Sequence, residues 1–102
     1  MLIVRGVNLF PSQVEEQVLR DPALSGHYVI ELDRMGALDD LVVRVEARLE
    51  AVDEARNRSA ALLGERLKGL CGLSATIEIV EPGGIERSLG KARRVIDRRP
   101  KS

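Results

Sequence analysis

The chain has 102 residues, a length that suits one domain. Its 16 acidic and 16 basic residues balance, so overall charge does not favour a polyanion, and 2% aromatic residues give no platform for stacking nucleic-acid bases. A hydrophobic content of 44% predicts a folded core built from Val, Ile, Leu and Ala.

Metal, disulfide and membrane chemistry find little support in the sequence. Cys71 is the only cysteine and His27 the only histidine, and neither has neighbours at metal-ligand spacing. We expect His27 to be structural or on the surface and Cys71 to be packed rather than nucleophilic. The apolar start is interrupted by Arg5 and no apolar run is long enough to span a membrane, so a soluble, cytoplasmic protein is predicted.

The N-terminal segment predicts a hairpin followed by a helix. Leu2–Val4 is a short apolar strand that turns at Arg5-Gly6 into a second apolar piece. Pro11 has the position of a first helical residue, and Asp21-Pro22 ends the helix.

Two strands with alternating apolar residues follow. The segments His27–Asp33 and Leu41–Leu49 are predicted to pair antiparallel across the loop Met35–Asp39.

A long helix and a further strand complete the regular structure. Asp53 is predicted as the N-cap of a helix that runs to about Cys71 and is stopped by Gly72. Ala75–Val80 alternates as a strand. The buried face of the helix is predicted to contain Ala55, Leu62, Leu63, Leu67 and Leu70.

The order of these elements predicts an α+β fold. A mainly antiparallel sheet would carry two helices on one face, in a βαββαβ-like plan with an N-terminal hairpin. The residues from Ile85 onward form a polar, basic tail in which Val95-Ile96 is the only apolar piece.

Three segments carry residues that chemistry could use, namely Arg5–Glu15, Glu81–Gly84 and Arg87–Ile96. Each also has a purely structural explanation. The first is a hairpin that leads into a helix, the second an ordinary loop, and the third a bend at Gly90 beside solvated basic residues.

Taken together, the two ends of the chain resemble one family. The run IVRGVNLFPSQ at residues 3–13 resembles the segment that follows the interdomain hinge in phenylacetate–CoA ligases, which are adenylate-forming acyl-CoA synthetases. The run RSLGKARRV at residues 87–95 resembles the terminal motif of the same family. The chain is thus similar to the mobile C-terminal domain of such a ligase over nearly its whole length.

The resemblance implies an activity that needs a second domain. A large N-terminal domain would bind ATP, with Mg²⁺ expected there, and an aromatic carboxylic acid. The ligase would convert ATP, acid and CoA into acyl-CoA, AMP and pyrophosphate through an acyl-adenylate. That domain is not in these residues, so the chain alone is predicted to be inactive and to act with the large domain as its partner.

The resemblance also implies residue roles. Lys91 matches the adenylation lysine, flanked by Gly90, and Gly6 matches the hairpin glycine that lines the pantetheine channel of CoA. Arg5 either contacts the adenosine or the large domain, or forms a structural ion pair. Arg94, with its neighbour Arg93, adds positive potential or is a surface charge.

Other readings stay open at this stage. A ferredoxin-like module that binds a small regulatory ligand would share the fold, because fold does not fix function. Nucleic-acid binding through the tail has weaker support, and a homodimer through an exposed strand is left open. Asn8 and Ser12 are interpreted as a turn residue and a helix-start residue.

Overall fold

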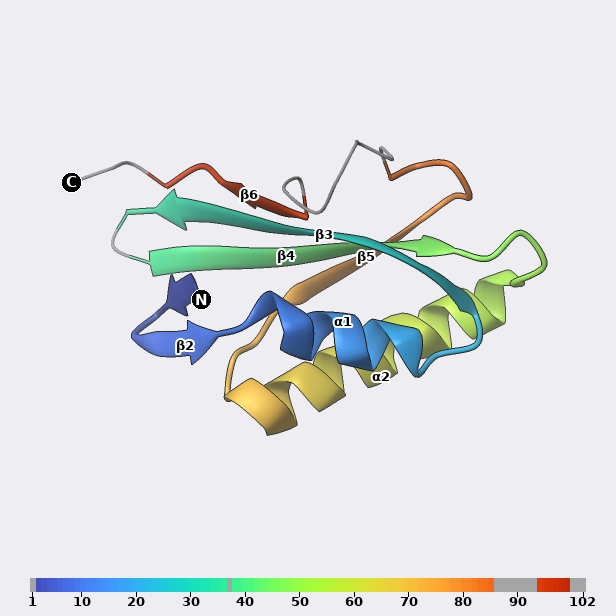
Figure 1. Cartoon of the computed structure of the whole chain (residues 1–102), viewed down its shortest axis with the longest axis horizontal. Coiled ribbons are helices and arrows are strands. Elements are labelled where there is room, and N and C mark those ends of the chain that lie inside the picture. The colour runs from blue at the N-terminus through green and yellow to red at the C-terminus, as the bar shows by residue number, and fades with distance from the viewer. Residues whose placement is uncertain (1, 37, 86–93, 100–102) are drawn as a thin grey trace.

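A computed structural model describes residues 2–36, 38–85 and 94–99 (Figure 1). Gly90 and Lys91 lie outside these ranges. The predicted hairpin is present: β1 (Leu2–Val4) and β2 (Val7–Leu9) pair antiparallel as a small sheet of their own. A βαββαβ plan would place the first strand in the main sheet, but here it lies outside that sheet.

The first helix begins as the sequence predicts. Helix α1 (Pro11–Leu19) opens on its proline, and Phe10 before it is extended with φ −102° and ψ 126°. The Gln13 side chain accepts a hydrogen bond from the Phe10 N–H at 3.1 Å, which satisfies a donor that helix geometry leaves free.

The second helix begins differently from the prediction. Helix α2 (Asp53–Cys71) has Val52 as its N-cap, so Asp53 is the first helical residue rather than the cap. A carboxylate is favoured by the helix dipole at either position, which is why the sequence does not distinguish them. The predicted stop is confirmed, since Gly72 takes the left-handed conformation at φ 73°.

The buried stripe of α2 is narrower than predicted and consists of Ser59, Leu63 and Leu67. Leu62 and Leu70 are 36% and 50% exposed, which corrects their assignment to the buried face. Leu62 lies one residue, about 100°, around the helix from Leu63, and Leu70 lies in the last turn.

The main sheet has four strands in the order β5-β4-β3-β6. The predicted antiparallel pair is confirmed at its centre as β3 (Leu24–Met35) and β4 (Leu38–Ala47), with a shorter turn than expected. The strand β5 (Thr76–Val80) is parallel to β4. The end of the basic tail adds β6 (Val95–Asp97), parallel to β3, where the sequence shows only a short apolar piece.

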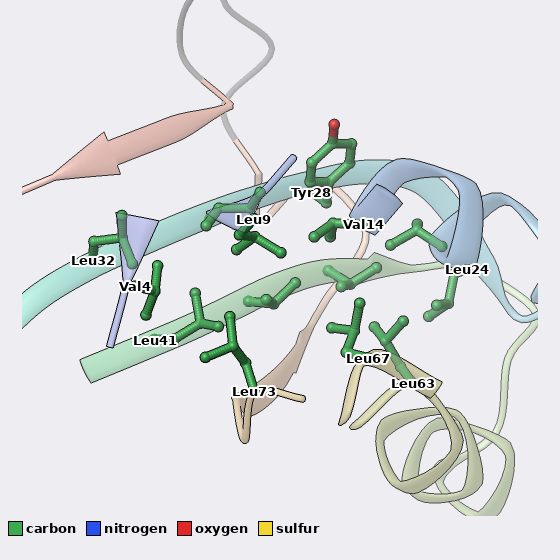
Figure 2. Packing of buried hydrophobic residues seen from close by; sticks show 14 residues of the cluster. Val4, Leu9, Val14, Leu24, Tyr28, Leu32, Leu41, Leu63, Leu67 and Leu73 are labelled. Atoms are coloured by element: carbon green, nitrogen blue, oxygen red, sulfur yellow. The ribbon is translucent and has the colours of Figure 1, made fainter. Parts of the chain in front are cut away.

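Both helices cover one face of this sheet, while β6 runs beside β3 at its far edge (Figure 1). Figure 2 shows the core between the layers, with the hairpin residues Val4 and Leu9 packed among sheet and helix side chains. The opposite face carries charges: Arg44 pairs with Glu31 at 3.1 Å and with Glu78 at 2.8 Å. The predicted α+β architecture is thus confirmed.

Candidate functional site

Gly6 lies at the exposed tip of the hairpin, where the backbone turns with positive φ. Its φ is 77°, and Arg5 before it is the one described non-glycine residue with positive φ, at 51°. A side chain at Gly6 would be strained by this conformation, yet it would meet no atom of the domain within 4 Å. The space in front of the turn is open, as close approach of another molecule requires.

Arg5 fastens the hairpin to the main sheet. Its backbone N–H donates to Oδ2 of Asp39 at 2.9 Å, and its Nε donates to the carbonyl oxygen of Asp39 at 2.9 Å. Its Nη1 reaches the carbonyl of Ser74 at 3.2 Å. Within the domain, the arginine therefore has a structural role, but its side chain plays it through hydrogen bonds to two carbonyl oxygens rather than through the ion pair that was one interpretation.

Asp39, at the start of β4, joins three parts of the chain. Besides the Arg5 N–H, its carboxylate accepts hydrogen bonds from Arg34 Nε at 3.0 Å and from Arg99 Nη1 at 3.2 Å. Arg99 also donates to the carbonyl of Ile3. The Arg5 N–H, followed by Arg34, lowers the pKa of Asp39 below its ordinary value. The hairpin and the C-terminal end are thus connected through one carboxylate.

A second acidic residue, Glu46, holds the loop after β5. It is 1% exposed and accepts a hydrogen bond from Ser25 Oγ at 2.7 Å and one from the Gly83 N–H at 2.6 Å. The loop Glu81–Gly84 is tight: a Cβ on Gly84 would lie 2.9 Å from the Glu81 carbonyl oxygen. The predicted loop is confirmed. Its contact with the buried Glu46 could not be predicted, because nothing in the local sequence marks Glu46 as buried.

Arg94 points onto helix α1. Its guanidinium forms an ion pair with Glu15 and lies 5.3 Å from the centroid of the Tyr28 ring. Burial alone would lower the pKa of Arg94, but the contacts with Tyr28 and Glu15 outweigh burial and raise it. Figure 2 shows the Tyr28 hydroxyl directed away from the labelled apolar side chains. Arg94 is therefore paired within the domain, rather than a free surface charge.

Most other candidate residues behave as the sequence predicts. His27 is exposed, and burial raises the pKa of the Cys71 thiol, which keeps it protonated. Helix α1 ends with an exposed i,i+4 ion pair, in which Arg20 Nη2 lies 3.1 Å from Glu16 Oε1. Ser12 is exposed at the start of α1, as predicted. Asn8, predicted as a turn residue, is instead an exposed residue of strand β2 that pairs with Ile3.

The described surface has two hollows that are open to solvent. Hollows of about 440 and 250 Å³ are lined by residues of α2 with β5 and of α2 with the segment after α1, and neither includes a predicted site residue. Across residues 2–36, 38–85 and 94–99, no group of three acidic, His or Cys side chains is placed to hold a metal. Nor does this part of the chain contain a helix long and apolar enough to cross a membrane.

Known sequences match this chain almost end to end. It is 46% identical to the phenylacetate-coenzyme A ligase of Aromatoleum evansii, over 99% of this chain and 24% of that protein. It is also 46% identical to the phenylacetate-coenzyme A ligase of Escherichia coli, over 97% of this chain and 23% of that protein. The chain thus spans about a quarter of the length of these curated relatives.

Solved structures agree with the sequences. A domain of phenylacetate-coenzyme A ligase from Bacteroides vulgatus superposes with a TM-score of 0.91 at 28% identity, over all of this chain and 95% of that one. The 2-hydroxyisobutyryl-CoA ligase in complex with 2-HIB-AMP and CoA superposes with a TM-score of 0.85 at 32% identity, over 97% of this chain and 21% of that one. These matches support the ligase interpretation and not a small-ligand regulatory module. The AMP-binding enzyme C-terminal domain family matches residues 6–99, and the chain belongs to that family.

Proposed function

We propose that this chain is the mobile C-terminal domain of an aryl-acetate CoA ligase and works against a large domain that binds ATP and the acid. The observation that carries the proposal is the match of nearly the whole chain to about a quarter of two phenylacetate-coenzyme A ligases. The open tip of the hairpin supports a partner domain that completes the site.

The proposed chemistry has two steps. In the first, a carboxylate oxygen attacks the α-phosphorus of ATP, a C–O–P linkage forms, and the bond to the β-phosphate oxygen breaks to release pyrophosphate. In the second, the CoA sulfur attacks the acyl carbon, its proton is released, and AMP leaves. Positive charge is needed most in the first step, because both reactants are anions.

Lys91 is the group proposed to supply that charge. An ammonium on a four-carbon stem can reach both the carboxylate and the phosphate oxygens and stabilise the negative charge shared between them. Gly90 beside it leaves the backbone without a side chain where the large domain approaches.

The hairpin is proposed to serve the second step. Gly6 presents backbone at an exposed turn with no atom of its own domain in front of it, which suits contact with a thin pantetheine arm. Arg5 holds that turn in place through Asp39 and Ser74. The superposable 2-hydroxyisobutyryl-CoA ligase has been solved in a thioesterification state and in a postadenylation state, as expected if one domain of this shape serves both steps.

A chimeric enzyme tests the proposal. Residues 1–102 replace the matching segment of the Escherichia coli phenylacetate-coenzyme A ligase, and pyrophosphate release is measured with ATP, phenylacetate and CoA. We expect turnover by the chimera and none by the 102-residue chain alone. An inactive chimera beside an active Escherichia coli enzyme would overturn the proposal.

The two half-reactions then test the residue roles. Lys91→Ala should slow acyl-adenylate formation about a hundredfold or more, with a much smaller effect on thioester formation from supplied phenylacetyl-adenylate. Gly6→Ala should show the reverse pattern. Equal losses in both half-reactions would contradict these assignments.

A further inference from the structure

We propose that Arg94 is a positioning residue for the adenylation step, which it serves by clamping the C-terminal segment onto helix α1. This inference rests on the proposed function, in which Lys91 is the adenylating group. It assigns to Arg94 a task that neither the fold nor the family match specifies.

The clamp has two independent contacts on two elements. The guanidinium pairs with Glu15 of α1, and the same group lies 5.3 Å from the centre of the Tyr28 ring of β3. Tyr28 is 3% exposed, so its ring is a fixed part of the core rather than a mobile surface group. A cation over a buried ring and beside a carboxylate is held in both direction and distance.

Backbone hydrogen bonds continue the attachment beyond Arg94. The Ile30 N–H donates to the Arg94 carbonyl at 2.7 Å, and the Arg98 N–H donates to the Leu32 carbonyl at 2.8 Å. These bonds lie at the two ends of the parallel pairing of β6 with β3 and do not involve the Arg94 side chain. Removing the guanidinium therefore leaves the backbone hydrogen bonds of β6 intact. What it removes is the contact that fixes the direction in which the chain enters β6.

That direction matters because Lys91 is close along the chain. Three peptide steps separate it from Arg94, so their Cα atoms are at most about 11 Å apart. On the other side, Ile85 lies six residues before Lys91, after the loop whose Gly83 N–H is bound by buried Glu46. Arg94 is therefore the described residue nearest to Lys91 along the chain. A displacement there shifts the base of the lysine, and misplacement of about 1 Å can cost two orders of magnitude in rate.

The alternative role for Arg94 is a stabilising surface ion pair. Its side chain and that of Glu15 are 35% and 33% exposed, so the pair contributes little as an isolated salt bridge. Reactivity rather than stability is therefore the measurement that separates the two roles.

The experiment is a double-mutant cycle in the chimeric ligase described above. Arg94→Ala is expected to slow acyl-adenylate formation about tenfold while thioester formation from supplied phenylacetyl-adenylate stays unchanged. In the Lys91→Ala background, Arg94→Ala should produce no further loss, because there is no longer a lysine to position. Arg66→Ala on the exposed part of α2 is the matched control and should leave both half-reactions unchanged.

Restoration of the pair provides a second readout. Exchanging the charges, with Glu15→Arg and Arg94→Glu together, should recover part of the adenylation rate that either change alone removes. A purely structural effect would instead lower both half-reactions in proportion to the loss of Tm.

The outcomes separate this inference from the proposed function. If Lys91→Ala slows adenylation but Arg94→Ala does not, the clamp is wrong and the proposed function stands. If Arg94→Ala slows adenylation by the same factor with and without Lys91, Arg94 acts by another route and the inference is overturned. If Lys91→Ala itself leaves adenylation unchanged, the role of Lys91 in the proposed function is wrong, and the inference about Arg94 is overturned with it.

Discussion

The two ends of this domain are held in different ways. The two strands of the N-terminal hairpin pair with each other across a local turn, and Val4, Leu9 and the Arg5–Asp39 contacts attach the hairpin to the domain. The C-terminal strand β6 has no local partner and exists only by pairing with β3, more than sixty residues earlier in the chain. One end is built from local pairing, and the other from pairing with a distant strand.

The comparison matters because each end carries a residue proposed for a different half-reaction. Gly6 lies on the hairpin, while Lys91 precedes β6. Among the described residues, Arg99 links the two attachments, because it binds Asp39, which also binds Arg5, and the Ile3 carbonyl. Separate attachments predict that the two ends can be loosened one at a time.

The largest effect is expected from the apolar contact of the hairpin. Leu9 is 1% exposed, and Leu9→Ala should lower the free energy of unfolding by about 2–4 kcal/mol, since it removes buried methyl groups and leaves a cavity. Leu38 is 69% exposed, and the control Leu38→Ala should change the free energy of unfolding by less than about 0.5 kcal/mol. Urea denaturation of the 102-residue chain measures both. Similar losses in the two variants would show that the hairpin does not dock through Leu9.

A smaller effect is expected at the carboxylate shared by both ends. In Asp39→Asn the amide nitrogen cannot accept the bonds from Arg5 and Arg99, so the Tm at neutral pH should fall by less than in Leu9→Ala. Because these partners lower the folded pKa of Asp39, its stabilisation is present above the unfolded value of about 3.9 and is lost as pH falls through the folded value.

The pH dependence of stability shows whether Asp39 acts through the charge of its carboxylate or only through the packing of its side chain. The difference in Tm between the unchanged chain and Asp39→Asn should be constant from about pH 5 to 8 and should shrink below about pH 4. Thermal unfolding followed by circular dichroism across this range measures it. A difference that persists undiminished at low pH would mean that the carboxylate charge is not what joins the two ends.

The sequence predicted most of what is local. Pro11 and Gly72 mark helix ends because their backbone preferences act within a few residues, and the turn at Gly6 follows from the same reasoning. The alternation that placed Ile30 and Val43 in the core also needs only the pleat of a strand.

The sequence did not predict what distant residues supply. Asp39 and Glu46 lie in a strand where a charged residue is expected to face solvent, yet each is buried by partners from several segments. The strand β6 is short and has no period of its own, so its pairing with β3 leaves no mark in the local pattern. The ion pair of Arg94 with Glu15 joins residues 79 positions apart, which is why its inward direction emerged only from the structure.

The smallest effect is expected from the other ion pair of helix α1. Arg20 and Glu16 are each 61% exposed, and Arg20→Ala should lower the free energy of unfolding by only about 0.3–0.5 kcal/mol, as is typical of exposed i,i+4 pairs. The loss should vanish in 1 M salt, where the Debye length is about 3 Å. Glu15, one residue before Glu16, pairs with Arg94 across the fold, so its contribution should be less sensitive to salt because the buried Tyr28 ring shields one side of the cation. Urea titrations at low and high salt compare the salt dependence of the two ion pairs. Equal salt sensitivity would indicate that the Arg94 pair is an ordinary surface pair, and that the backbone bonds and the Arg99 contacts hold the C-terminal end without it.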